Sequence, residues 1–346
     1  MFQDAVDAQQ RGDLASAISR YHELLRLAPN LPDAHANLGA ALAALGQYPA
    51  AITEYQTALR ITPSQNGIRF NLALAFYKSS RFDEAAREFA ALRRSDPNDA
   101  RIATLLADSY SRLNQDPRAV EVLAPLLPAH SADMDLTYVL GSALIRSGKA
   151  EEGVRLVEQV AANTRSADAY LLSGATRLSL NQKDEAIRNF EAASALSPNL
   201  PGLHTQLGIA KEGSGDLDGA ESELRRALNQ NPADFEATVH LAGILYGRRD
   251  LKQARLFVDR ALEIKPTSTF ALYERALIES ASGDQVSAAG DLEKVTAEDP
   301  HWLDPHVQLS ALYYKLRRPA EGQRERDIVQ RLLEEQQNSG STSSIR

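Results

Sequence analysis

The residues whose types could support catalysis or metal binding are seven histidines and a large number of carboxylates. The histidines are His22, His35, His130, His204, His240, His301 and His306, and none belongs to an HExxH pair or another metal-binding signature. The chain has no cysteine, which excludes disulfides and thiolate metal ligands. Nothing in the spacing of the 46 Asp and Glu residues marks a pair as buried, so a solvated surface explains them.

Motifs for phosphate binding and nucleophilic catalysis do not occur either. The sequence contains no GxxxxGK[ST] loop and no GxSxG elbow. The glycine-rich run Gly213–Ser214–Gly215 falls where a turn between two helices is expected. We therefore predict that the protein is not an enzyme and that it uses no cofactor and no metal.

Net charge and the distribution of apolar residues limit which partners and which cellular compartment we expect. The net charge of −8 argues against nonspecific nucleic-acid binding, which needs clustered Lys and Arg side chains on the phosphates. No window approaches 18 continuous apolar residues, so we expect no direct membrane insertion. Residues 1–14 lack the basic and apolar segments of a signal peptide. We expect a cytoplasmic protein, or a periplasmic or membrane-anchored one if an upstream signal segment was removed.

The elements that must position any functional residue repeat with a fixed period. Prolines recur every 34 residues, at Pro29, Pro63 and Pro97 and again at Pro198, Pro232, Pro266 and Pro300. The gap between the two series leaves room for three more units with one residue deleted. A constant period of this length indicates a stack of similar supersecondary units.

Each unit is predicted to be a pair of amphipathic helices. In residues 32–65, one apolar stripe precedes Gly46 and a second follows Pro49, both at helical spacing. Gly46 can adopt the left-handed conformation that ends a helix, and Pro63 stops the second helix. Pro117, Pro125 and Pro128 predict a short or bent second helix within residues 115–131.

Three register positions carry the packing. A small residue recurs in the first helix at Gly39, Ala73, Ala107, Gly141, Gly174, Gly208, Ala242 and Ala276. Another recurs in the second helix, for example at Ala51 and Ala254, with a large residue such as Tyr55 or Val258 four positions later. Small residues let paired helices approach, and the large residue fills the remaining space. His35, His204 and His306 share one register position, so we interpret them as packing residues.

These marks closely resemble the tetratricopeptide repeat (TPR) family. The resemblance implies an all-α, right-handed superhelical solenoid of antiparallel helix pairs, with about ten repeats including a truncated first and a degenerate last. We expect the solenoid to occupy residues 1–337 and a disordered C-terminal tail to occupy residues 338–346. The family's first aromatic position is mostly altered, with His35, Thr238 and Leu272 there and Tyr170 the best match.

The resemblance also implies a binding groove along the first helices. The sixth position of each unit would face this groove, and neighbouring rows add aromatic and basic side chains. The candidate peptide-binding residues are Asn37, Phe70, Asn71, Tyr77, Lys78, Arg112, Tyr138, Arg146, Gln206, His240, Tyr246, Tyr273, Gln308 and Tyr314. Ala36 and Ala40 stand where the family's chaperone-binding carboxylate clamp needs polar side chains, so we expect no chaperone C-terminus to bind.

Two charged rows have different interpretations. Lys78, Arg112 and Arg146 recur at one register and predict a basic ridge. A ridge beside Leu105, Val139 and Leu172 would suit a peptide with apolar and acidic residues. Capping and the helix dipole explain the acidic row at the starts of first helices, to which we assign no partner. That row is Asp33, Asp135, Asp168, Glu236 and Asp304.

The function favoured by the sequence is a protein-interaction scaffold that binds an extended peptide or a helix of a partner. The first alternative is a docking or regulatory module whose catalytic part lies elsewhere. A helical-repeat RNA reader ranks last, because such repeats have a 35-residue period and strong basic charge. We expect a monomer or a weak homo-oligomer.

Overall fold

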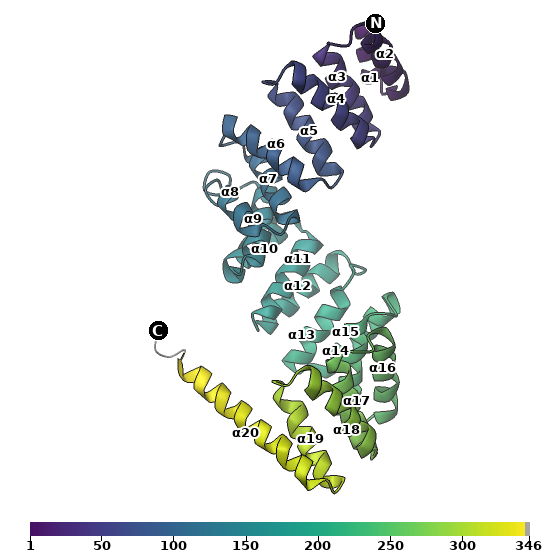
Figure 1. Cartoon of the computed structure of the whole chain (residues 1–346), viewed down its shortest axis with the longest axis vertical. Helices are drawn as coiled ribbons and strands as arrows, with labels where there is room; N and C mark the ends of the chain where they lie inside the picture. Colours follow the sequence, from purple (N-terminus) through teal and green to yellow (C-terminus); the bar gives the residue numbers. More distant parts are fainter. Residues whose placement is uncertain (343–346) are drawn as a thin grey trace. The chain divides into compact units, whose positions relative to one another are not determined.

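A computed structural model shows a chain of α-helices joined by short turns (Figure 1). It describes the backbone of residues 1–342 and the side chains of residues 1–335. Within this range there are 20 helices and no strand. The predicted all-α repeat array is confirmed, and first and second helices alternate along the chain.

The chain divides into two compact units, Met1–Thr176 and Arg177–Arg346. The boundary falls near the end of α11 (Ala167–Ser179). In the first unit the first helices of the pairs are α1 (Phe2–Gln10), α3 (Pro32–Ala44), α5 (Asn66–Lys78), α7 (Ala100–Arg112), α9 (Met134–Arg146) and α11. The second helices are α2 (Leu14–Leu27), α4 (Tyr48–Ile61), α6 (Phe82–Ser95), α8 (Asp116–Leu123) and α10 (Ala150–Thr164).

The second unit continues the same alternation. Its first complete helix is the second helix α12 (Lys183–Leu196). Its first helices are α13 (Leu203–Ser214), α15 (Phe235–Gly247), α17 (Thr269–Ser282) and α19 (Leu303–Lys315). Its other second helices are α14 (Leu217–Gln230), α16 (Leu251–Ile264), α18 (Gln285–Glu298) and α20 (Pro319–Thr342).

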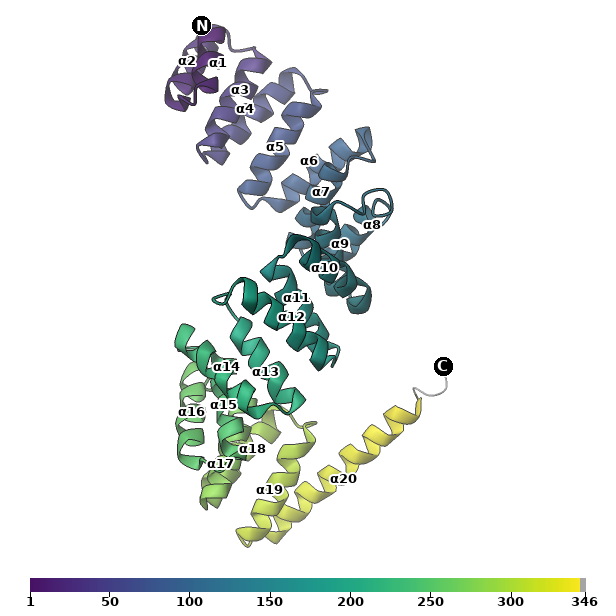
Figure 2. The same ribbon diagram turned by 180° about the vertical axis from the view of Figure 1, so that it is seen from behind.

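Within each unit the helices stack in chain order, as both views show (Figures 1 and 2). Second helices contact their own first helix and the first helix that follows, as α4 does with α3 and α5 and α14 does with α13 and α15. First helices also contact one another, as in α7 with α9 and in α13 with α15 and α15 with α17. The first helices of a unit are called its inner row below, and this is the surface that the family resemblance assigns to the groove.

The close approach within a pair depends on the predicted small residues. A Cβ added to Gly39 would lie 2.8 Å from a ring carbon of Tyr55, and one added to Gly208 would lie 2.7 Å from Leu224 Cγ. Tyr55 and Leu224 are both buried. The large residue of the second helix thus fills the space opposite the small residue of the first, as the sequence predicts.

The turn between the helices of a pair uses the left-handed backbone conformation. Gly46 has φ +73°, which confirms its predicted role as a helix stop. The same turn position in other repeats is left-handed even without glycine, for example at Asn114 with φ +57° and Arg249 with φ +64°. The turn geometry is therefore set by the helix pair, because the neighbouring helices hold it against the intrinsic preference of the residue.

A polar clamp ties consecutive repeats together at the shared histidine position. The Nδ1 atom of His204 lies 2.6 Å from Glu223 Oε2, and its Nε2 lies 2.9 Å from the carbonyl oxygen of Pro198. His35 and His306 make the same contacts with Glu54 and Pro29 and with Glu325 and Pro300. Arg69 makes them with Glu88 and Pro63. These histidines are structural, and they act through hydrogen bonds in addition to packing.

Two predictions concern irregular helices. The short second helix expected in residues 115–131 is confirmed, since α8 ends at Leu123 and a run of turns follows. At the C-terminus, α20 continues to Thr342, so its last turns include residues 338–342, which the sequence assigns to a tail. Residues 343–346 of that predicted tail lie outside the described residues.

Candidate functional site

A cavity of about 740 Å³ opens on the inner row of the first unit. Its wall is built mainly by α7 and α9, with Tyr77 from α5 and residues from α10 and the start of α11. Leu105, Val139 and Tyr138 supply its apolar and aromatic lining. Helical periodicity explains the convergence, because residues at the same register on α7 and α9 face the same side of the row.

The cavity brings together three of the predicted groove residues: Tyr77, Arg112 and Tyr138. The hydroxyl of Tyr77 donates a hydrogen bond to the carboxylate of Asp108, and Arg112 Nε lies 3.5 Å from the same carboxylate. Burial and the neighbouring Asp108 raise the pKa of Tyr77 above its usual value. The Asp108 carboxylate also raises the pKa of Arg112. This rim of the cavity is therefore held in place by a neutralised cluster.

The predicted basic ridge is neutralised at two of its three positions. Besides the contact of Arg112 with Asp108, Arg146 Nε lies 2.9 Å from Oδ1 of Asp116, a carboxylate that is 6% exposed. Lys78 is exposed and makes no hydrogen bond or ion pair with the described residues. Two of the three cations of the predicted ridge thus already have an aspartate partner, and the binding of an acidic peptide by this ridge stays a prediction.

The other predicted residues of the first unit lie outside this cavity. Asn37 is half-buried, whereas Asn71 is exposed. The ring of Phe70 packs edge-on against Phe89 at 6.0 Å between centroids, and the Arg101 guanidinium lies 4.5 Å from the centre of the Phe70 ring. Phe70 thus packs against the side chains on at least one side of its ring. The row that contains Asn37 and Asn71 continues with Leu105, which is not an amide.

In the second unit, Gln206 and His240 lie in a largely acidic setting. Gln206 Nε2 lies 3.5 Å from Glu236 Oε2, and His240 Nδ1 lies 2.7 Å from Glu212 Oε2. The adjacent Glu274 is half-buried, and burial, reinforced by the Glu212 carboxylate, raises its pKa to about 7. Repeat symmetry collects these polar residues on neighbouring first helices.

Three predicted tyrosines of the second unit contact neighbouring side chains of the repeat. The ring of Tyr273 lies 4.8 Å from that of Trp302, and burial raises its pKa to about 12. Tyr246 is half-buried against the hydrophobic core. Tyr314 turns to its own second helix, where its hydroxyl donates to Gln323 and its ring covers Gly322. Gln308 is exposed on α19.

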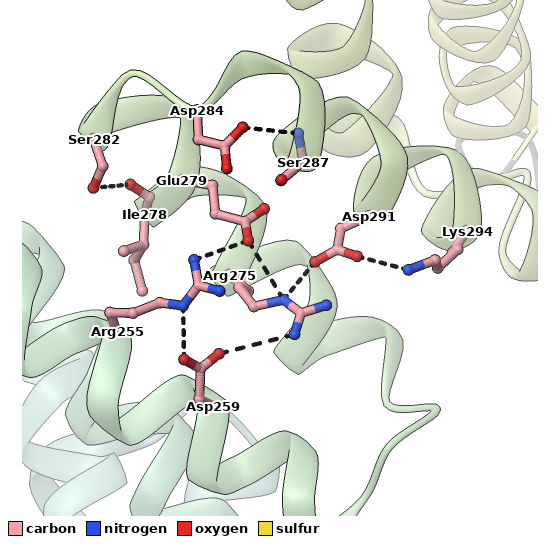
Figure 3. Close-up of polar contacts among 10 residues, drawn as sticks. All are labelled: Arg255, Asp259, Arg275, Ile278, Glu279, Ser282, Asp284, Ser287, Asp291 and Lys294. Atoms are coloured by element: carbon pink, nitrogen blue, oxygen red, sulfur yellow. Dashed lines mark hydrogen bonds and ion pairs between the residues drawn. The ribbon is translucent and has the colours of Figure 1, made fainter.

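A network of charged side chains joins α16, α17 and α18 (Figure 3). Arg275 Nε lies 2.6 Å from Asp291 Oδ2, and Arg255 pairs with Asp259 at 2.7 Å and with Glu279 at 2.9 Å. Asp291 is 3% exposed and Glu279 is 4% exposed. These two buried carboxylates correct the expectation that the Asp and Glu residues form a solvated surface. Their cationic partners include residues of other helices, which local spacing in the sequence does not reveal.

The structure also bears on metals and membranes. Among the described residues, no group of three or more His, Asp or Glu side chains is placed to hold a metal ion. No helix in the described part of the chain is both long and apolar enough to cross a membrane.

Sequence reasoning misses the acidic part of the cavity. Asp108, Asp135 and Asp168 all line it. Asp135 and Asp168 belong to the acidic row that the sequence explains by capping, but the caps are other residues. Asp133 accepts from the Leu136 N–H, and the Ser166 hydroxyl accepts from the Ala169 N–H. The available signal is the presence of a capping residue two positions earlier in each case.

Antiparallel helix pairs, repeated along both units, define a helical-repeat protein of the class that presents extended binding surfaces. Family models described as "TPR repeat" match residues 10–46 and 40–80, and "Tetratricopeptide repeat" models match residues 70–133, 138–201 and 205–269. The chain belongs to the tetratricopeptide repeat family.

Individual relatives are distant. The chain is 24% identical over 170 residues to cellulose synthase operon protein C of Pseudomonas fluorescens (strain SBW25), a match covering 49% of this chain and 11% of that protein. It is 24% identical over 151 residues to anaphase-promoting complex subunit 3 of Schizosaccharomyces pombe (strain 972 / ATCC 24843), covering 43% of this chain and 23% of that protein. The chain thus matches less than a quarter of the length of either relative.

A solved structure of similar fold is the C-terminal part of a TPR repeat-containing protein from Cytophaga hutchinsonii. Its TM-score is 0.54 with 19% sequence identity, and the match covers 69% of this chain and 99% of that one. This similarity concerns the fold alone.

Proposed function

We propose that the protein is a non-catalytic interaction scaffold that binds a segment of a partner protein along its first helices. The observation that carries the proposal is the cavity of about 740 Å³ on the inner row of the first unit. Leu105, Tyr138 and Val139 give it an apolar and aromatic wall, and polar groups surround that wall. Pockets with this combination are the usual docking points for side chains of a bound segment.

Membership of the TPR family supports the same proposal, since its fold is typically a scaffold for protein contacts. The partner segment, extended or helical, would place one apolar side chain against Leu105 and Val139 while its backbone follows the row. The sequence and the fold support a protein or peptide as the partner class.

Site-specific photocrosslinking in cells of the source organism tests this function. A photoreactive phenylalanine analogue replaces Tyr138 in the cavity wall, and in a matched protein it replaces Leu27, which is 64% exposed on the second helix α2. We expect a discrete crosslinked partner from position 138 and none from position 27. Crosslinks of equal yield at both positions, or only at position 27, would contradict binding in the inner row.

A cavity-blocking variant adds a second readout. Leu105→Arg and Val139→Arg fill the apolar wall without removing an ion pair, and they should abolish the position-138 crosslink while circular dichroism stays unchanged. The charge reversals Arg112→Glu and Arg146→Glu are poorer tests. They would place like charges beside Asp108 and the buried Asp116, so lost binding could simply report lost stability.

The second candidate function is a docking module of a larger assembly. It is favoured by the similarity to a protein named as a subunit of a complex, of which this chain matches 23%. Native mass spectrometry of the tagged chain purified from its source tests it. A stable assembly with stoichiometric partners supports a docking module, whereas a free chain with substoichiometric partners supports the first proposal.

A further inference from the structure

The charge of the first-unit cavity indicates what kind of segment it binds. Its lining contains three carboxylates, Asp108, Asp135 and Asp168, and one guanidinium, Arg112. Arg112 and the Tyr77 hydroxyl both contact Asp108, so that carboxylate is compensated within the protein. The net charge of the remaining lining residues is negative and comes from Asp135 and Asp168.

These two aspartates are open to a ligand. Both are exposed, and neither makes a hydrogen bond or an ion pair with any of the described residues. They do not serve as helix caps, since Asp133 and Ser166 accept the backbone N–H groups at those helix starts. Their position in the first turn of α9 and α11 brings a dipole stabilisation of about 0.3–1 kcal/mol each, which leaves the carboxylate oxygens free.

The rest of the wall suits the stem of a long cationic side chain. Tyr77 and Tyr138 present aromatic rings, and Leu105, Val139 and Val160 present aliphatic surface. The methylene groups of Lys or Arg pack on such surface while the charged end reaches a carboxylate. A cation is also attracted to the face of a tyrosine ring, whereas an anion is repelled by it.

We propose that the segment bound in this cavity carries a Lys or Arg side chain, which lies along Tyr138 and pairs with Asp135 and Asp168. This proposal rests on the proposed function and gives its ligand a charge. The charge proposed for the bound segment is positive, whereas the Lys78, Arg112 and Arg146 row predicts an acidic peptide. The reversal follows from the structure, because Arg112 and Arg146 are already paired and the two aspartates are not.

Selection from a random peptide library tests the charge preference without knowledge of the natural partner. A phage library of peptides about twelve residues long, enough to follow several first helices, is selected on the full chain. The same selection uses the Asp135→Asn, Asp168→Asn variant. The matched control is Glu121→Gln, Asp184→Asn, which neutralises two exposed carboxylates outside the cavity, one of them also in a first helical turn.

We expect peptides enriched in Lys or Arg from the native chain and from the control, and no basic enrichment from the cavity variant. A labelled peptide from the enriched set should lose affinity about tenfold with the cavity variant and less than about twofold with the control, and added salt should weaken it. Peptides enriched without basic residues would overturn this inference while leaving the scaffold function standing. No enriched peptide from the native chain would count against both.

Discussion

The imidazole of His204 bridges Glu223 of its own repeat and the carbonyl oxygen of Pro198 at the end of the preceding one. His204 is 5% exposed and Glu223 is 8% exposed, so the bridge is made away from bulk water. A carbonyl oxygen can only accept, so Nε2 must carry a proton. The clamp therefore joins consecutive repeats through a buried imidazole that donates from Nε2 to the Pro198 carbonyl oxygen and contacts the Glu223 carboxylate through Nδ1.

Replacing this donor should destabilise the second unit according to what replaces it. His204→Leu removes the imidazole from Glu223 Oε2 and from the carbonyl oxygen of Pro198, while Arg226 still contacts Glu223 Oε1 at 3.2 Å. We expect a loss of about 1–3 kcal/mol in the free energy of unfolding. His204→Arg should cost less than about 1 kcal/mol, because Arg69 makes the same two contacts in its own repeat. Urea unfolding followed by circular dichroism measures both. Equal losses for Leu and Arg would show that the hydrogen bonds contribute nothing beyond shape.

Glycine positions give a second test, of helix contact distances. A Cβ at residue 153 would lie 2.4 Å from the carbonyl oxygen of Gly141 and 2.8 Å from the backbone nitrogen of Ile145. Because these neighbours are backbone atoms, Gly153→Ala should force α9 and α10 apart at a cost of about 1–3 kcal/mol or more.

The control for that variant is Gly290→Ala in α18, where a Cβ would meet no atom within 4 Å. This change should stabilise the protein by up to about 1 kcal/mol through helix propensity alone. Thermal melts of the two variants are expected to move in opposite directions. A common shift would mean that propensity, not contact distance, dominates at both sites.

The buried network of α16, α17 and α18 offers a comparison between two cations that share Asp291. Both cations contact the Asp291 carboxylate (Figure 3). The side chain of Arg275 is 24% exposed and that of Lys294 is 63% exposed. Arg275→Ala removes a partner from both Asp291 and Glu279, so we expect a cost of about 3–5 kcal/mol. Lys294→Ala should cost less than about 1 kcal/mol, since solvent screens the exposed pair. Similar losses in chemical denaturation would contradict a special role for the buried pair.

Glu274 predicts a pH dependence. Burial raises its pKa to about 7 in the folded protein, from an ordinary value of 4.5. The folded chain therefore binds this proton more tightly than the unfolded chain. Its contribution to stability is present below pH 4.5 and is lost as the pH rises through 7. Glu274→Gln removes the ionisation, and we expect it to gain up to about 3 kcal/mol relative to the native chain across this window.

Denaturation of native protein and Glu274→Gln at a series of pH values measures this difference. The exposed Glu263, which makes no hydrogen bond or ion pair with the described residues, supplies the control substitution Glu263→Gln. A difference between Glu274→Gln and native protein that stays constant with pH would contradict the burial of the charge. A pH-dependent gain shared by Glu263→Gln would place its cause elsewhere.

The local parts of the fold were predictable because they depend on short-range patterns. Apolar spacing predicts each helix, and the prolines at 34-residue intervals mark where second helices end. Proline clustering likewise predicts the shortened α8. The pairing of Gly39 with Tyr55 follows from register within a single repeat.

The candidate site was predictable only in part. Register places Tyr77, Arg112 and Tyr138 on one surface, and the cavity does contain all three. Their charge environment was not predictable, because Arg146 finds its carboxylate on Asp116, 30 residues away in the preceding repeat. Which of several nearby side chains reaches across depends on rotamers and on helix separation, and neither is encoded in spacing.

The sequence by itself determined the helix pairs, their number and the family, because a repeat fixes structure through contacts between neighbours in the chain. The tertiary structure alone decided which charges remain available. Arg112 and Arg146 are neutralised by Asp108 and Asp116, Glu279 and Asp291 are buried, and Asp135 and Asp168 stay open. The physical reason is that an ion pair depends on distances of a few ångströms between side chains of different helices, and those distances exist only after the repeats have packed.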